Sequence, residues 1–315
     1  MNHPSLLAEN PTISVKDLPP NDSAAFKYSS FFSRNRPHSK LPAPAQIRER
    51  ALELDAAADC SPRPAPVRYE DIRLLVKFGR EPDVTEGEAQ CFWALRRVLP
   101  QVPVPEVYGW THDKDQVFIY MELVRGFTLE EAWNSMSSEE KVDICQQLKL
   151  YISELRTLRH APGEFFLGHI NYEPLGCISF MNGTRPPAGP FNSVAEFHDW
   201  MSLMTKAGME HNWPGYTTEE IPDPLRKELP DDSPVVFTHD DLHPSNIILS
   251  ITQPRRIIAL IDWRQSGWYP DYWEFCKAVF TVPGDGEWAT EYIPRFLEEP
   301  NCLDTWEWYS RTFGY

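Results

Sequence analysis

Glycine is absent from the first 78 residues of this 315-residue chain, which contains only 15 glycines in all. Backbone amides approach a phosphate most closely where no side chain intrudes, so this absence excludes a glycine-rich phosphate loop from that stretch. Ten of the 30 prolines precede residue 67, in motifs such as "LPAPA" and "SPRPAP". Residues 1–66 are therefore predicted to be a Pro-rich extension that is partly ordered at best, with one helix near "PAQIRERALEL".

Long hydrophobic runs and paired cysteines are also missing. No apolar stretch approaches the roughly 18 residues that span a bilayer, and the start "MNHPSLLAEN" has no basic region followed by an apolar one. The six cysteines are scattered without a CxxC pair or a metal-like spacing, which favours reduced thiols. These absences predict a soluble, cytoplasmic protein that has no membrane partner.

Basic residues are scarce in the second half of the chain. The net charge is −16, and residues 1–125 carry 17 acids and 16 bases, whereas residues 126–315 carry 29 acids and 14 bases. An acidic surface repels the phosphates of nucleic acids, so nucleic acid is not expected as a partner. The surplus of acids is the ordinary source of solubility, and it also favours a cationic small-molecule partner.

Strands and capped helices are distributed unevenly. Short strands are predicted at Ile72–Phe78, ended by Gly79, and at Gln116–Val124, with a helix between them that begins at a TxxE capping box in "TEGEAQCFWALRRV". Long helices follow in "SSEEKVDICQQLKLYISELRTLRH" and "SVAEFHDWMSLM", and each begins with a serine cap and an acidic residue three positions on. The first helix is predicted to place one apolar stripe in the core: Val142, Cys145, Leu148, Ile152, Leu155 and Leu158. The pattern predicts an α+β protein with a small strand-rich lobe over residues 67–125 and a larger, mainly helical lobe over residues 126–315.

The stretch "VVFTHDDLHPSNIILS", residues 235–250, places many polar side chains between two apolar strands. Such crowding is costly unless each polar group finds a partner. A further strand in "RRIIALIDW" ends at Asp262, and a hairpin through "ITQPRR" would return Asp262 to Asn246 and Asp241. Two carboxylates and an amide oxygen are hard ligands, so this end of the hairpin is a candidate Mg²⁺ site.

The order His239, Asp241, Asn246 and then Asp262 resembles the HxDxxxxN catalytic loop and the metal-binding Asp of the aminoglycoside phosphotransferase and choline kinase-like families. The segment "GWYPDYWEFCKAV", from Gly267, is similar to the fungal-type branch of the phosphotransferase-domain proteins, although its aromatics are expected to pack rather than to bind substrate. The resemblance spans about residues 70–280. It implies a bilobal protein kinase-like fold and the transfer of the γ-phosphate of ATP to a small-molecule hydroxyl, with Mg²⁺ as a second cofactor.

The resemblance also implies roles for individual residues. Asp241 is expected to be the catalytic base, or to orient the acceptor hydroxyl, while His239 braces the loop. Asn246 and Asp262 are expected to hold Mg²⁺, and Lys77 to bind the α and β phosphates of ATP.

Two further sets of residues belong to the expected nucleotide cleft. Glu88 faces inward with the apolar side of its helix, so it is expected to pair with Lys77, although a purely local role in the capping box would also explain it. Met121 would stand beside the adenine, and the backbone of Glu122 and Val124 would bond its edge. The alternative for these three residues is an ordinary core strand.

Three departures from the family pattern leave the activity open. The glycine loop is missing, Asp240 fills a place usually held by glycine, and Arg264 follows "IDW", where it would either bind phosphate or repel Mg²⁺. The alternatives to an active kinase are a catalytically silent binding protein and a repurposed nucleotide-using enzyme. The presence of four polar site residues together favours the active enzyme: Lys77, Asp241, Asn246 and Asp262. The pocket for its acceptor is expected in the part of the helical lobe that follows Phe165, with the "FHDWM" helix as a candidate wall.

Overall fold

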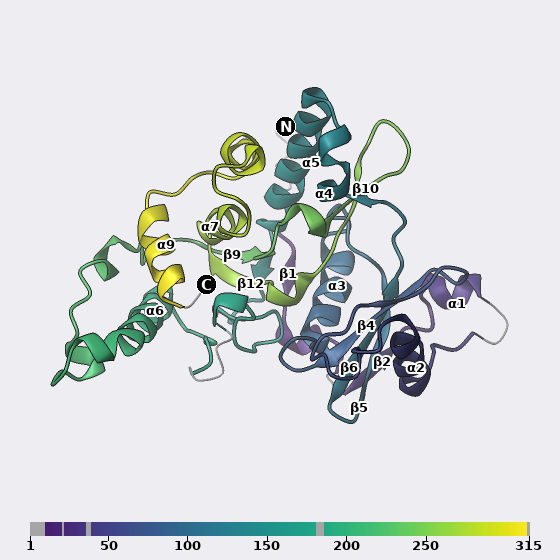
Figure 1. Ribbon diagram of the computed structural model, residues 1–315, viewed down its shortest axis with the longest axis horizontal. Helices are drawn as coiled ribbons and strands as arrows, with labels where there is room; N and C mark the ends of the chain where they lie inside the picture. Colours follow the sequence, from purple (N-terminus) through teal and green to yellow (C-terminus); the bar gives the residue numbers. More distant parts are fainter. Residues whose placement is uncertain (1–9, 21, 36–38, 181–185, 314–315) are drawn as a thin grey trace, which may run out of the picture.

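The computed structural model describes residues 10–20, 22–35, 39–180 and 186–313 (Figure 1). A strand-rich lobe and a larger, mainly helical lobe lie side by side, which confirms the predicted α+β, two-lobed architecture.

The strand-rich lobe is built on a five-stranded antiparallel sheet in the order β2-β5-β6-β4-β3. Its strands are β2 (Ser23–Ala25), β3 (Val67–Tyr69), β4 (Leu74–Arg80), β5 (Val107–Asp113) and β6 (Gln116–Glu122). The strand predicted to end at Gly79 begins two residues later than expected and runs through this glycine to Arg80.

Both faces of this sheet are covered. Successive side chains of a strand point to opposite faces, and in β4 Val76 and Phe78 face one core while Lys77 faces the other way. The first face packs against α1 (Ser30–Arg34) and α2 (Pro44–Leu54), and α2 is the helix predicted at this place. The second face packs against α3 (Glu86–Val98). Burial on both sides explains why these strands are nearly continuous apolar runs.

The segment before residue 67, predicted to be a loosely packed extension, contributes to both lobes in its described part. Strand β1 (Thr12–Ile13) pairs in parallel with β8 (Arg159–His160) of the helical lobe. Strand β2 then pairs with β5 at the edge of the N-terminal sheet, and α1 and α2 cover the outer face of that sheet.

The described part of the helical lobe contains six α-helices: α4 (Leu129–Ala132), α5 (Ser138–Leu155), α6 (Val194–Met209), α7 (Trp273–Phe280), α8 (Ile293–Phe296) and α9 (Leu303–Thr312). Ser137 and Glu140 form the predicted capping box at the start of α5. Five of the six residues predicted to form its apolar stripe are buried in the core. None of the helices in the described ranges is both long enough and apolar enough to cross a bilayer.

Short strands in the helical lobe position the residues of interest. The predicted hairpin is present as β10 (Ile247–Leu249) and β11 (Ile257–Leu260), and β7 (Phe127–Thr128) extends it. Beside it, β9 (Val235–Thr238) pairs with β12 (Gly267–Pro270). The backbone N–H of Ile261 donates to the carbonyl of Asn246 at 2.9 Å, which places Asp262 next to the end of the loop before β10.

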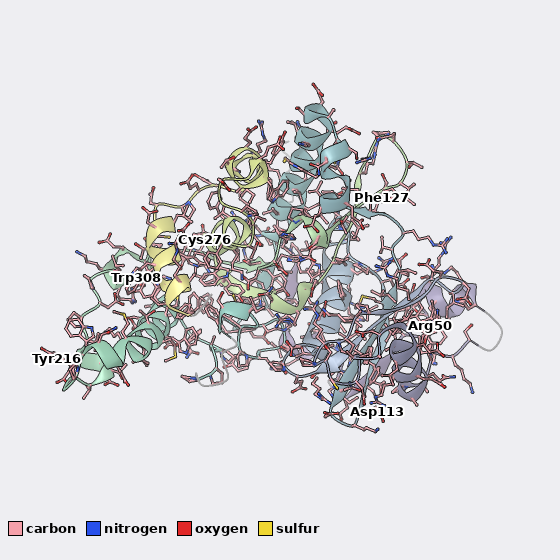
Figure 2. All side chains as sticks on the ribbon, viewed as in Figure 1. Arg50, Asp113, Phe127, Tyr216, Cys276 and Trp308 are labelled. Atoms are coloured by element: carbon pink, nitrogen blue, oxygen red, sulfur yellow. The ribbon has the colours of Figure 1, made fainter. Side chains whose placement is uncertain are left out.

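One hydrophobic core runs from the inner face of the sheet through α3 to α5 and the hairpin, so the two lobes share it. A second core lies among α6, α7 and α9 and contains Cys276 (Figure 2). The active-site candidates lie along the shared core, between the lobes.

Candidate active site

The loop after β9 is held by the imidazole of His239. Its Nε2 bonds the carbonyl oxygen of Ile261 at 3.1 Å, and its Nδ1 accepts from the backbone N–H of Asp241 at 3.2 Å. This pattern requires a neutral ring that carries its proton on Nε2. Burial lowers the pKa of His239 and so favours this neutral form. These contacts are the bracing contacts that the sequence predicts for His239.

Asp241 and Asn246 are in direct contact. The side-chain Nδ2 of Asn246 donates to the backbone carbonyl of Asp241 at 2.9 Å and to its Oδ2 at 3.0 Å. The 3₁₀ turn Pro244–Asn246, which His243 caps, produces this approach. With its nitrogen directed at Asp241, the amide of Asn246 turns its oxygen, the atom that a cation would bind, to the other side.

Lys77 joins the two lobes through ion pairs. Its Nζ lies 2.5 Å from Oε2 of Glu88 and 2.8 Å from Oδ1 of Asp262. Lys77 and Glu88 are both buried, so the inward pairing predicted for them is present. The capping-box prediction is wrong: Thr85 is the N-cap of α3, but its side chain makes no capping hydrogen bond, and the carboxylate of Glu88 is directed at Lys77 instead.

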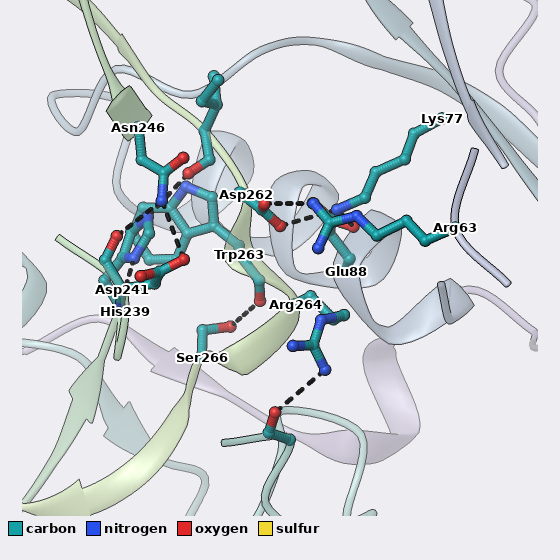
Figure 3. A network of polar contacts seen from close by, with 12 residues as sticks. Arg63, Lys77, Glu88, His239, Asp241, Asn246, Asp262, Trp263, Arg264 and Ser266 are labelled. Carbon is teal, nitrogen blue, oxygen red and sulfur yellow. Dashed lines mark hydrogen bonds and ion pairs between the residues drawn. The ribbon is translucent and has the colours of Figure 1, made fainter. Parts of the chain in front are cut away.

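Asp262 has a left-handed backbone conformation, with φ 63° and ψ 62°, between β11 and the 3₁₀ turn Trp263–Gln265. Its Oδ2 lies 2.5 Å from Nη2 of Arg63, while its Oδ1 bonds Lys77 (Figure 3). Burial alone would raise the pKa of Asp262, but the charges of Lys77 and Arg63 outweigh it and hold this pKa well below the usual range. Asp262 therefore carries a full negative charge that attracts cations.

Arg63 is a site residue that the sequence reasoning missed, because it was assigned to the N-terminal extension. The available signals were indirect: a lone arginine in "SPRPAP" just before the lysine strand, and the missing glycine loop.

The sequence reasoning also missed the roles of Asp240 and Glu274, which together hold the loop after β9 in place. The carboxylate of Glu274 accepts from the backbone N–H groups of His239 at 2.7 Å and of Asp240 at 3.1 Å. Asp240, with φ 65°, accepts from Nε1 of Trp273 at 2.6 Å and from the hydroxyl of Tyr269 at 3.2 Å. Burial raises the pKa of Glu274 to about 7 and that of Asp240 to about 6.

The expected adenine-binding residues lie along β6 and its continuation. Met121 is buried, and the backbone N–H of Glu122 donates to the carbonyl of Glu106 at 2.8 Å, so it is committed within the protein. Glu122 and the half-buried Val124 line a cavity of about 600 Å³ on the side of the α3–β5 connection. Lys77, Asp241 and Asp262 do not line that cavity, so it does not connect the expected adenine-binding residues with the ion-pair network.

Arg264 is buried, and its Nη1 donates to the carbonyl of Gly176 at 3.2 Å. Its guanidinium is turned away from Asp262, toward the loop that precedes α6 (Figure 3). This bond ties the turn Trp263–Gln265 to Gly176.

A second cavity, of about 380 Å³, lies between the start of α3 and residues 169–180 and 187–188, and it reaches Arg264. Its walls combine acidic and apolar side chains, among them Glu81, Glu86, Glu173, Leu175 and Phe180. Burial raises the pKa of Glu173, and the charges of Glu86 and Glu81 raise it further, so these carboxylates share one electrostatic field.

The helix expected to form a wall of the acceptor pocket has another role. Phe197, Trp200 and Met201 of α6 lie in the second core, and none of them lines the 380 Å³ cavity.

Known proteins are similar to this chain over most of its length. The family model described as "Phosphotransferase enzyme family" matches residues 57–310. No curated protein matches the sequence. Among solved structures, the chain is similar to the aminoglycoside-3′-phosphotransferase of type VIII, with 18% identity, 85% of this chain and 91% of the other covered, and a TM-score of 0.45.

Two further solved structures are similar at the same level. The ADP-bound aminoglycoside phosphotransferase APH(2″)-Ib shares 11% identity over 86% of each chain, with a TM-score of 0.49. The aminoglycoside phosphotransferase APH(3″)-Id of Streptomyces rimosus shares 14% identity over 86% of this chain and 99% of the other, with a TM-score of 0.45.

Proposed function

Since this chain belongs to the phosphotransferase enzyme family, we propose that it transfers the γ-phosphate of ATP to a hydroxyl group of a small molecule, with Mg²⁺ as cofactor. One observation carries this proposal: the pair Asp241 and Asn246 and the ion-pair network of Lys77, Glu88 and Asp262 lie together between the lobes (Figure 3). Phosphoryl transfer needs positioned acceptors and cationic charge more than covalent chemistry, and these residues supply both.

The residues present fit a magnesium ion. Asp262 already attracts two cationic groups, and the amide oxygen of Asn246 adds a neutral hard ligand on the adjacent loop. Asp262 and Asn246 would hold the ion. When bound, Mg²⁺ would neutralise charge on the phosphate oxygens.

Asp241 is the proposed base. Its carboxylate would accept the proton of the acceptor hydroxyl, or orient that hydroxyl toward the γ-phosphate. The N–H of Asn246 holds one of its oxygens, and His239 holds its backbone N–H. Lys77, fixed by Glu88, would direct its ammonium group at the phosphates.

The acceptor is proposed to bear an amine. The cavity that reaches Arg264, two residues beyond Asp262, gathers Glu81, Glu86 and Glu173 beside apolar walls. Several carboxylates in one half-apolar cavity favour a cationic ligand with an apolar body.

A thermal-shift experiment tests the proposal. A ligand that binds only the native state raises its melting temperature, so ATP and ADP should each do so, and more strongly with Mg²⁺ than with EDTA. Release of ADP is then measured with a library of hydroxylated amines and with matched acceptors that lack the amine. No shift at millimolar nucleotide would contradict the proposal and favour a protein that does not use nucleotide. A Mg²⁺-dependent shift without ADP release from any acceptor would favour a silent binder.

A further inference from the structure

Arg63 enters the site from a segment that packs directly on the lysine strand. The carbonyl of Pro62 accepts from the backbone N–H of Arg80 at 2.8 Å. A Cβ added at Gly79 would lie 2.5 Å from that carbonyl oxygen, which is closer than side-chain carbons come. Gly79, two residues after Lys77, thus creates the space in which residues 62 and 63 cross β4.

The guanidinium of Arg63 lies among acidic groups at the open edge of the site. It pairs with Oδ2 of Asp262 at 2.5 Å, yet 38% of its side chain stays exposed (Figure 3). An arginine side chain stays protonated at any ordinary pH, so Arg63 is a permanent cation next to the proposed metal-binding residue.

Beside Lys77, no glycine-rich loop is available in this chain to supply further ligands for the phosphates. No glycine precedes Gly79, so a loop of glycine amides ahead of the lysine strand is absent from the sequence. A guanidinium offers several N–H donors in a planar fork that matches phosphate oxygens. In addition, a divalent cation bound at Oδ2 of Asp262 would compete with Arg63 for the charge of that oxygen, which would weaken the bond between Asp262 and Arg63.

We propose that Arg63 is a ligand of the nucleotide phosphates, and that it exchanges its bond to Asp262 for these phosphates when the nucleotide and the cation enter. The proposal rests on the proposed function, because it assumes nucleotide in the cleft beside Lys77. In this arrangement the side chain of Arg63, from the segment before β3, would bind the phosphates that backbone amides bind in a glycine-rich loop.

Binding measurements test this without any turnover. ATP, ADP and adenosine are titrated by calorimetry into the wild-type protein and the variants Arg63→Ala, Arg63→Lys and Arg68→Ala, with EDTA and with Mg²⁺. Arg68 is exposed on β3, five residues along the same segment, and is the matched control. Arg63→Ala should weaken ATP and ADP at least about tenfold, since a charge-assisted hydrogen bond is lost. Arg63→Lys should weaken them less, and Arg68→Ala not at all.

Adenosine separates phosphate binding from a structural role. It has no phosphate, so its affinity should be the same in all four proteins, whereas a distorted cleft would weaken it too. An ATP affinity of Arg63→Ala equal to or tighter than that of the wild type would overturn this inference and leave the proposed function standing. A tighter affinity would also show that Arg63 obstructs the site. Absence of nucleotide binding in the wild-type protein would overturn the proposed function together with it.

Discussion

At the scale of single residues, Asp262 combines a rare backbone conformation with two cationic partners. A positive φ is uncommon outside glycine, and Asp and Asn tolerate it better than most residues. The left-handed conformation turns the chain sharply after β11, and it is in this conformation that the carboxylate reaches both Lys77 and Arg63. Asp262 is thus the point at which the cationic side chains of β4 and of the segment before β3 meet the helical lobe.

Asp241→Ala should abolish phosphate transfer while leaving nucleotide binding. Loss of a positioned base lowers the rate by at least about a hundredfold. Asp241 is only partly buried and its side-chain bond to Asn246 is single, so the melting temperature should change little. ADP release and ATP titration measure the two effects, with Asp285→Ala, at an exposed position, as the control. Wild-type turnover in Asp241→Ala would remove this residue from the mechanism.

Lys77→Met should lower both stability and ATP binding. The change leaves Glu88 buried without its cation, which costs about 3–5 kcal/mol in comparable buried pairs. The double variant Lys77→Met with Glu88→Met removes both charges, so it should recover much of the free energy of unfolding but none of the ATP affinity. Urea unfolding and ATP titration measure the two quantities. ATP affinity that returns with stability would show that Lys77 acts only through the fold.

At the scale of elements, the first turn of α7 and the loop after β9 form one unit. The carboxylate of Glu274 accepts hydrogen bonds from two backbone N–H groups of the loop. Nζ of Lys277, one turn later in α7, lies 4.0 Å from Oδ1 of Asp240. This helix therefore sets the position of the loop that carries Asp241, although no residue of α7 is proposed to touch the substrate.

Glu274→Gln should destabilise the protein more at pH 5 than at pH 8. Burial raises the pKa of Glu274 to about 7 from its ordinary value of 4.5, so the native state retains a proton that the unfolded chain has lost. Ionisation of Glu274 therefore costs wild-type stability as the pH rises from about 4.5 through 7, and glutamine has no such cost. The difference in unfolding free energy between variant and wild type should shrink over that range.

Urea unfolding at several pH values measures this difference, and Glu299→Gln, at an exposed position, serves as the control. A difference that stays constant between pH 5 and pH 8 would show that the carboxyl group does not titrate there.

Local patterns in the sequence predicted the elements that local chemistry determines. The capping box at Ser137, helix α2 and the β10–β11 hairpin are present as predicted, because caps, periodicity and turns act over a few residues. The contact of Lys77 with Glu88 was also foreseen, from the inward side of α3 together with the family resemblance, whereas the direct bond from Asn246 to Asp241 was not.

Contacts between segments that are distant in sequence are not marked by any such local pattern. Strands β1 and β2 are only two and three residues long, so their pairing depends on the shape of the surface that receives them. Arg63 lies 199 residues from Asp262 in sequence, and nothing in "SPRPAP" specifies that approach. The positions of Glu274 and Arg264 likewise depend on burial that only the assembled lobe creates.

At the scale of the whole molecule, the N-terminal segment should be required for stability. Deletion of residues 1–30 removes β1, β2 and Phe26, whose ring packs against Trp110 in the shared core. The sheet would lose its edge strand at β5, and buried aromatic surface would become exposed. Loss of soluble expression, or a melting temperature lower by at least about 5 °C, is expected. A deletion that ends at Asn10 keeps both strands and is the control, and equal melting temperatures of the two truncations would contradict the prediction.

Strand β1 pairs with β8 of the helical lobe, whereas β2 pairs with β5 of the strand-rich lobe, so the chain crosses between the lobes from β1 to β2. The connection from β6 to β7 crosses between them as well. These covalent crossings and the common core restrain any displacement of one lobe against the other. The separation of Lys77 and Asp262 is therefore a property of the assembled molecule, and neither lobe could reproduce it alone.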